Sequence, residues 1–182
     1  MSFFKRIIRK LKNWLHKHDG GERQVSTPGK GVKFENKTFF PIIIEEINRG
    51  HSVTINLKGR SMRPFLESDR DKAVLTRVGE LRVGDPVLAE IQPGFYVLHR
   101  IVKMEGDDVT LMGDGNLTCE YCKKADFRAS VVEFYRKGST KPDRIDGCKW
   151  RIYSWWWMHL RPFRRYLLAA YRYIWLNIFR LK

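Results

Sequence analysis

The sequence predicts a mainly β fold, a curled antiparallel sheet or small barrel with amphipathic helices at both termini. Short runs in which apolar and polar residues alternate recur at roughly ten-residue spacing, which is typical of strands with one buried face. Turn-forming glycine and proline residues separate the runs, so strands joined by turns are favoured over a parallel sheet with crossover helices. A short helix over 39–48, beginning near Pro41, precedes most of them. The predicted strands cover 53–57, 72–78, 86–91, 95–102, 109–112 and 129–135.

The excess of positive charge is confined to the two ends of the chain. The 182 residues carry a net charge of +15. Residues 1–18 hold six Lys and Arg, residues 149–182 hold eight, and neither segment has an acidic residue. The remainder holds 21 basic and 20 acidic residues, so no nucleic-acid partner is expected. We divide the chain into a basic amphipathic helix, a polar linker, a β domain and an aromatic, basic helical tail, at 1–18, 19–36, 37–146 and 147–182.

Both terminal segments combine basic with aromatic and apolar residues. Over 1–18, apolar residues recur at helical spacing and Lys and Arg fill the opposite face, as in helices of a membrane interface. The tail places Trp and Tyr among Arg, the composition of a headgroup belt, and is divided at Pro162. Its uncharged runs, such as 166–171, are all far shorter than the roughly 18 residues of a spanning helix. We expect both segments to bind an anionic membrane surface. The alternatives are packing against the domain or an oligomer partner, nucleic-acid binding by the first segment, and a tilted span by the second.

The N-terminal residues and the cysteines favour a reducing compartment. Residues 3–15 are charged every few positions and lack the apolar stretch of a secretory signal. Three cysteines do not make a disulfide framework, and Cys119 and Cys122 form a Cys-x-x-Cys pair without a second pair of ligands. We expect ordinary thiols, no metal, no cofactor, and a peripheral protein at the cytoplasmic face of a membrane.

Ser61 follows a predicted strand at a sharp corner. Gly59 permits unusual backbone conformations there, and Pro64 stiffens the exit. We expect Met62 in the wall of an apolar pocket. Backbone amides around Ser61, in the segment that begins at Gly59, would point at a developing oxyanion.

His99 is the candidate base. A serine hydroxyl is a weak nucleophile until a base removes its proton, and neutral imidazole is the usual base. His99 lies within the alternating run 97–102, where a half-buried strand would hold it rigidly. If Ser61 and His99 meet, the protein cleaves acyl bonds. The alternative is a core histidine bonded to backbone.

Four motifs in order are similar to those of the signal peptidase I and LexA-type serine peptidase superfamily. They are Gly-Arg-Ser-Met-Arg-Pro, Val-Gly-Asp-Pro-Val, His-Arg-Ile-Val and Gly-Asp-Gly-Asn, at 59–64, 83–87, 99–102 and 113–116. The resemblance covers about 58–138. It implies a serine nucleophile, Ser61, on a mostly β peptidase fold. A histidine in the third motif is similar to the branch of the archaeal, endoplasmic-reticulum and sporulation-type signal peptidases, and implies His99 as general base.

The resemblance also implies a carboxylate that orients the imidazole. Asp114 lies inside the Gly-Asp motif, and Glu120 falls near the later position where that branch usually has Asp. Either carboxylate can hold the useful tautomer and stabilise its charged form. We place Asp114 before Glu120, although Asp114 can instead cap a tight turn.

The substrate expected from the resemblance is a peptide or protein with a leader or signal segment, cut near a membrane surface. The hydrophobic span that precedes the serine in that branch is replaced by 39–50, which is short and carries Glu45 and Glu46. This favours leader-bearing or membrane-proximal substrates over translocated signal peptides. The competing hypotheses are a self-cleaving regulator and a catalytically inactive, membrane-binding module on the same fold.

Overall fold

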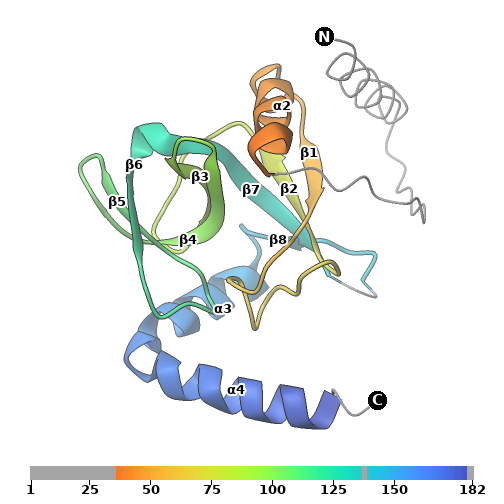
Figure 1. The fold of residues 1–182 in the computed structure, drawn as a ribbon, viewed down its shortest axis with the longest axis vertical. Helices are drawn as coiled ribbons and strands as arrows, with labels where there is room; N and C mark the ends of the chain where they lie inside the picture. Colours follow the sequence, from red (N-terminus) through yellow and green to blue (C-terminus); the bar gives the residue numbers. More distant parts are fainter. Residues whose placement is uncertain (1–35, 137–138, 180–182) are drawn as a thin grey trace. The chain divides into compact units, whose positions relative to one another are not determined.

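The computed structural model describes residues 36–136 and 139–179 (Figure 1). The predicted helix over 1–18 and all but the last residue of the predicted linker over 19–36 lie outside these ranges. Within them the elements are α2 (Asn36–Asn48), β1 (Val53–Asn56), β2 (Lys72–Thr76), β3 (Pro86–Gln92), β4 (Phe95–Glu105), β5 (Asp108–Met112), β6 (Glu120–Lys123), the 3-10 helix η1 (Lys124–Asp126), β7 (Phe127–Tyr135), β8 (Asp143–Arg144), α3 (Cys148–His159), the 3-10 helix η2 (Arg161–Phe163) and α4 (Arg164–Phe179).

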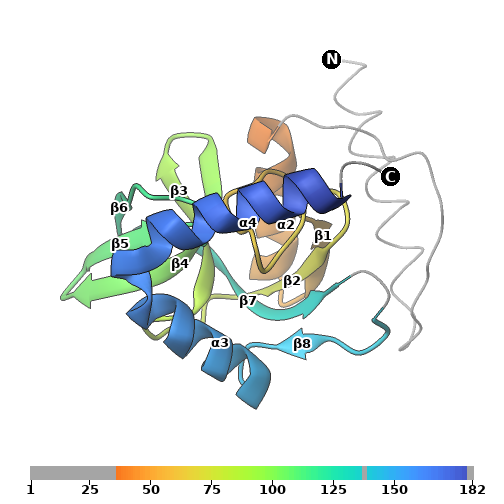
Figure 2. The ribbon, with the colours of Figure 1, turned by 90° about the horizontal axis from the view of Figure 1, so that it is seen from below.

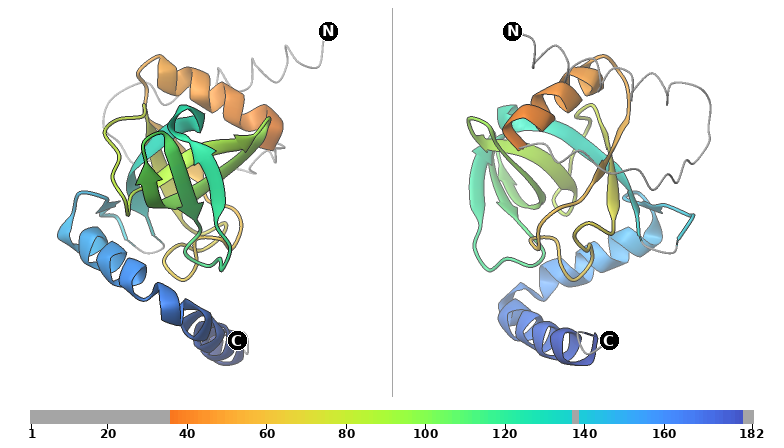
Figure 3. Two further views of the ribbon diagram at one scale, coloured as in Figure 1. Left: turned by 90° about the vertical axis from the view of Figure 1, so that its left-hand side faces the viewer. Right: turned by 45° about the vertical axis from the view of Figure 1, so that its right-hand side comes forward.

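The strands form one antiparallel, curled sheet, which confirms the predicted fold class. Its order is β1-β2-β7-β3-β4-β5-β6, and β8 pairs with β7 outside this path. Register shifts interrupt the ladders in β2, β3 and β4. Because such irregularities bend a strand and increase its twist, the half of the sheet from β3 to β6 curls over, as the left view of Figure 3 shows.

The apolar residues of the alternating runs form two clusters, on opposite faces of the sheet. In β1, Val53 and Ile55 are buried and the residues between them are exposed. In β3, Leu88 packs into the cluster beneath α2, whereas Val87 and Ala89 pack into the second cluster with β4 and β5. Neighbouring strand residues point to opposite faces, so β3 contributes to both.

Helix α2 begins at Asn36 instead of near Pro41, so the predicted start is wrong. A proline inside a helix loses only its own bond to the carbonyl four residues earlier, and here that carbonyl lies in the first turn. The ring of Pro41 is exposed, while Ile43 and Ile47 are buried against the sheet. Packing of Ile43 and Ile47 stabilises the helix, which therefore extends to Asn36, on the N-terminal side of Pro41.

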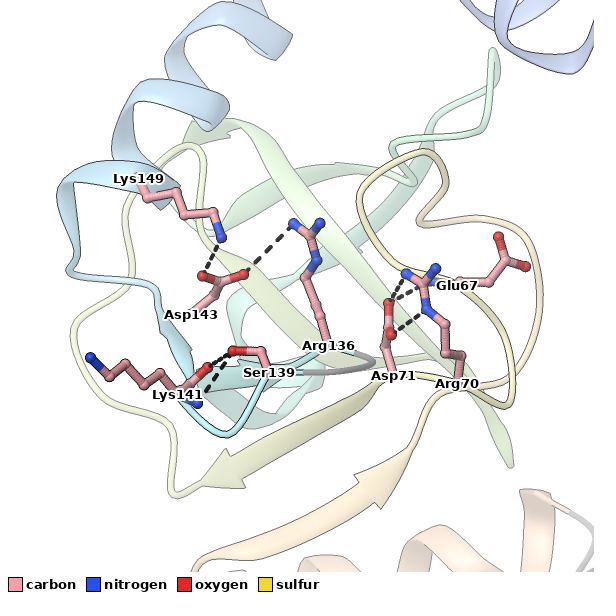
Figure 4. A network of polar contacts seen from close by, with 8 residues as sticks. All are labelled: Glu67, Arg70, Asp71, Arg136, Ser139, Lys141, Asp143 and Lys149. Atoms are coloured by element: carbon pink, nitrogen blue, oxygen red, sulfur yellow. Dashed lines mark hydrogen bonds and ion pairs between the residues drawn. The ribbon is translucent and has the colours of Figure 1, made fainter. Parts of the chain in front are cut away.

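Helix α3 packs on the domain by one face and exposes the other. Its buried residues, Trp150, Ser154 and Trp157, recur at helical spacing. The Trp150 ring lies 4.8 Å from that of Phe65 and 5.1 Å from that of Phe134, between centroids. Lys149 Nζ donates to Asp143 Oδ1 of β8 at 2.6 Å (Figure 4). Packing against the domain, which was the alternative to membrane binding for this segment, therefore describes the inner face of α3.

Helix α4 follows after η2, which contains Pro162 and marks the predicted break. It runs along the side of the domain opposite α2 (Figures 1 and 2). Arg164 and Leu168 are buried, and Tyr166 and Tyr173 are exposed. Among the residues described, no helix combines the length and apolar character needed to cross a lipid bilayer.

Two tryptophans of α3 provide a matched pair for stability. Trp150 is 1% exposed and Trp155 is 55% exposed. We expect Trp150→Ala to lower the free energy of unfolding by about 3–5 kcal/mol, because it leaves a cavity in the aromatic cluster. Trp155→Ala should change it by no more than about 0.5 kcal/mol. Urea unfolding measures both, and equal effects would show that α3 does not dock by its inner face.

Candidate active site

Ser61 lies in the loop between β1 and β2, and hydrogen bonds close the base of this loop. Leu57 N–H donates to Asp71 O at 2.9 Å, and Asp69 N–H donates to Leu57 O at 2.8 Å. The buried Asp71 carboxylate accepts from Glu67 N–H at 2.9 Å and from Arg70 Nε and Nη2 at 2.6 and 2.7 Å (Figure 4). Both ends of the loop are thus fixed to the sheet, so Ser61 is carried at a set position.

The glycines of the Gly-Asp-Gly-Asn motif hold the backbone of Ser61. Gly115 N–H donates to Ser61 O at 2.7 Å. A Cβ atom at Gly113 would lie 2.5 Å from Ser61 O, closer than any side chain tolerates. The loop that follows β5 therefore lies directly against the serine loop, and glycine is required because backbone meets backbone there.

His99 lies on β4, and the register explains its partner. Ile101 is opposite Leu111, and Leu111 is opposite Glu120, so these residues share one face with His99, two positions before Ile101. His99 is 4% exposed, and its Nδ1 is hydrogen-bonded to Glu120 Oε2. A carboxylate accepts and does not donate, so Nδ1 carries a proton and, in the neutral ring, the lone pair lies on Nε2.

Ser61 and His99 line the same pocket, which has a volume of about 130 Å³. The serine loop forms one wall and the first half of β4 the other. Gly59 and Met62 are also in the lining. The apolar side chains of the lining are Leu57, Met62, Leu66, Tyr96, Val97 and Leu98. Within the described ranges, no hydrogen bond joins Ser61 to His99; catalytic contacts of this kind often tighten only when substrate binds.

The amides near the serine differ in whether they are engaged. Gly59 has a φ of +98°, and its N–H donates to Ser68 Oγ at 3.1 Å, so this amide is occupied within the loop. Among the described residues, no hydrogen bond uses the N–H of Ser61 or Met62. These two amides are the candidates for binding an oxyanion.

Asp114 does not contact His99, so the prediction that placed it before Glu120 is corrected. It is fully buried and accepts from Arg100 Nε and Nη2 at 2.8 and 2.7 Å. Tyr153 of α3 donates to Asp114 Oδ2 at 3.1 Å. Because Arg100 and His99 are neighbours on β4, their side chains lie on opposite faces, and Asp114 is on the face of Arg100.

Sequence reasoning missed Arg100 and its partners on α3. Arg100 Nη1 donates to Gly84 O at 2.7 Å and to Ser154 Oγ at 2.5 Å. The His-Arg motif contains this arginine, but no spacing in the sequence links it to a serine 54 residues later. Only the docking of α3 brings the two together.

The cysteines do not form disulfides. Cys119, Cys122 and Cys148 are free. Burial raises the pKa of the Cys122 thiol to about 11, which keeps it protonated and weakly reactive at neutral pH. Among the residues described, no group of three or more His, Cys, Asp or Glu could hold a metal ion.

No protein-family model matches the sequence, and a search of curated proteins found no match either. Any assignment of activity therefore depends on the residues of this site, their geometry and the resemblance of the four motifs.

Gly113 gives a test of the backbone contact behind Ser61. Gly113→Ala places a methyl group against Ser61 O, and we expect a loss of about 1–3 kcal/mol of unfolding free energy from overpacking. Gly79 is the control, since a Cβ there meets nothing within 4 Å. Gly79→Ala should be neutral or stabilising by up to about 1 kcal/mol. Urea unfolding of both variants decides, and an unchanged Gly113→Ala would contradict the close packing of the two loops.

Proposed function

We propose that this chain is a serine endopeptidase in which Ser61 is the nucleophile and His99 the general base. The single observation that carries the proposal is that Ser61 and His99 line one pocket while His99 Nδ1 is bonded to Glu120. This arrangement leaves Nε2 as the nitrogen that can accept a proton. The resemblance of the four motifs supports the same roles for Ser61 and His99.

The reaction follows from these positions. Ser61 Oγ attacks the carbonyl carbon of the scissile peptide bond as its proton passes to His99 Nε2. The amides of Ser61 and Met62 bind the oxyanion, and Glu120 stabilises the imidazolium. His99 then protonates the leaving amine, the C–N bond breaks, and an acyl ester remains on Ser61. Water, deprotonated by the same imidazole, attacks the ester, and the acid is released as Ser61 regains its proton.

The proposed substrate is a leader- or signal-type peptide with a small apolar side chain at the cleavage site. The pocket has a volume of about 130 Å³ and apolar side chains form part of its lining, so the size of a side chain limits whether it can enter. Lys58 and Glu67 lie in the same lining and can contact polar backbone on either side. The pocket would therefore select the substrate side chain by its size, and Lys58 and Glu67 add charge to the lining.

We further propose that the protein works as a peripheral protein at the cytoplasmic face of a membrane. The outer faces of α3, η2 and α4 expose aromatic side chains, Trp155, Trp156, Phe163, Tyr166 and Tyr173. Arg151, Arg161, Arg165 and Arg172 are exposed on the same elements. Aromatic rings and arginines together suit an anionic leaflet, where each basic residue adds about 1 kcal/mol of binding, and such lipids are enriched on the cytoplasmic side.

Ser61→Ala should abolish cleavage of a peptide with small residues before the cut, assayed in the presence of lipid or detergent. His99→Ala should do the same, with losses of up to about 10⁶-fold in kcat, because the two residues act as a unit. Glu120→Gln should reduce kcat by about 10²–10⁴-fold, since the imidazole loses the charge that holds its tautomer.

Ser52→Ala, at an exposed position before β1, is the matched control and should cleave like the wild type. Cleavage that survives Ser61→Ala would contradict the proposal. Intact mass after long incubation separates self-cleavage from cleavage of added peptide. A pocket that binds peptide in every variant without cleaving it would identify the inactive binding module.

Vesicle sedimentation tests the membrane proposal. The protein should bind phosphatidylcholine vesicles more tightly when they contain phosphatidylserine, and raised salt should weaken this binding by screening. Trp156→Ala with Phe163→Ala should weaken it several-fold, whereas Phe95→Ala, which removes an exposed ring on the sheet, should not. Equal binding to both kinds of vesicle, or equal loss in both variants, would contradict an anionic surface at α3 and α4.

A further inference from the structure

We infer that Ser154 and Tyr153 of α3 are positioning residues for the active site. They complete the hydrogen bonding of the Arg100–Asp114 pair, which joins the strand of His99 to the loop that holds Ser61. The inference rests on the proposed function, because the residues are positioned for that reaction. It assigns to α3 a part in catalysis in addition to any part in membrane binding.

The ion pair is fully buried and bidentate. Arg100 and Asp114 are both 0% exposed, and two parallel N–H···O bonds of 2.8 and 2.7 Å join them. Removing two charges from water is unfavourable unless good geometry and additional hydrogen bonds satisfy the remaining polar atoms. The pair therefore depends on its surroundings for its remaining partners.

Helix α3 supplies most of those partners. Ser154 Oγ accepts from Arg100 Nη1 at 2.5 Å, and Tyr153 OH donates to Asp114 Oδ2 at 3.1 Å. The guanidinium carbon of Arg100 lies 4.5 Å from the centroid of the Trp150 ring. Burial and the charge of Asp114 raise the pKa of Tyr153, so its hydroxyl stays protonated and remains a donor. One hydroxyl from α3 thus serves each member of the pair.

The pair connects these hydroxyls to both reacting groups. Arg100 is the next residue after His99 in the rigid β4 strand, so a shift of its side chain strains the backbone that carries the imidazole. Asp114 lies between Gly115, whose N–H donates to Ser61 O, and Gly113, where an added Cβ would meet the same oxygen. A displacement of about 1 Å between reacting groups can reduce a rate by roughly 10²-fold. The α3 hydroxyls therefore affect kcat without touching the substrate pocket.

The docking of α3 does not depend on these two oxygen atoms. Trp150 and the ring of Tyr153 provide its apolar contact with the domain. Ser154→Ala and Tyr153→Phe each remove one oxygen and leave the rest of the side chain in place. They separate the positioning role from the packing of the helix.

The experiment measures kcat and KM for Ser154→Ala, Tyr153→Phe and the double variant, using Ser61-dependent cleavage as the assay. We expect kcat to fall about 10- to 100-fold while KM changes less than about two-fold, because the loss is one of alignment and not of substrate contact. Ser154→Thr, which keeps a hydroxyl, should recover most of the rate. Ser52→Ala makes the same chemical change as Ser154→Ala at an exposed position before β1 and should have no effect.

The outcomes separate the two proposals. If the wild type cleaves and both single variants retain its kcat, the inference is overturned and the proposed function stands. If the wild type shows no Ser61-dependent cleavage, the proposed function fails and the inference with it. Thermal unfolding shows whether each variant is folded. If Ser154→Ala does not fold, the kcat of Tyr153→Phe tests the inference. A fall in kcat with rescue by Ser154→Thr supports the positioning role.

Discussion

The buried ion pair between Arg100 and Asp114 is the constraint on which the rest of the site depends. A guanidinium and a carboxylate without contact with water are stable only when nearly every donor and acceptor has a partner. The chain meets this requirement from four places: β4, the glycine loop after β5, the carbonyl of Gly84 before β3, and α3. Segments distant in sequence are thereby fixed around Arg100, which follows His99 on β4.

The two faces of the sheet hold two different polar contacts, one made by His99 and the other by Arg100. On one face of β4, His99 meets Glu120 from the edge strand β6 and opens into the apolar pocket. On the other face, Arg100 is enclosed and meets α3. The first contact leaves an imidazole nitrogen available for proton transfer, and the second holds the backbone in place. Two adjacent residues, His99 and Arg100, therefore bind different carboxylates, Glu120 and Asp114, without competing for the same partners.

Alternation of apolar and polar residues was enough to predict the longer strands, because one-sided burial imposes that period. It was not enough for β6 and β8, which have four and two residues and little apolar pattern. The choice between Asp114 and Glu120 could not be made from chain spacing, since both follow β5 and only the register opposite Leu111 selects Glu120. In α3, aromatic residues occur all round the helix, so the pattern did not show which face is buried.

The two faces of α3 have a consequence for how such a protein can change over time. The helix presents Tyr153 and Ser154 to the Arg100–Asp114 pair and exposes Trp155 and Trp156. A different C-terminal segment in place of this one would need to place a hydroxyl group beside Arg100. Otherwise the buried guanidinium would lose a hydrogen-bond partner. Inheritance of the tail is therefore tied to inheritance of the buried ion pair, and the two should be gained, kept or lost together.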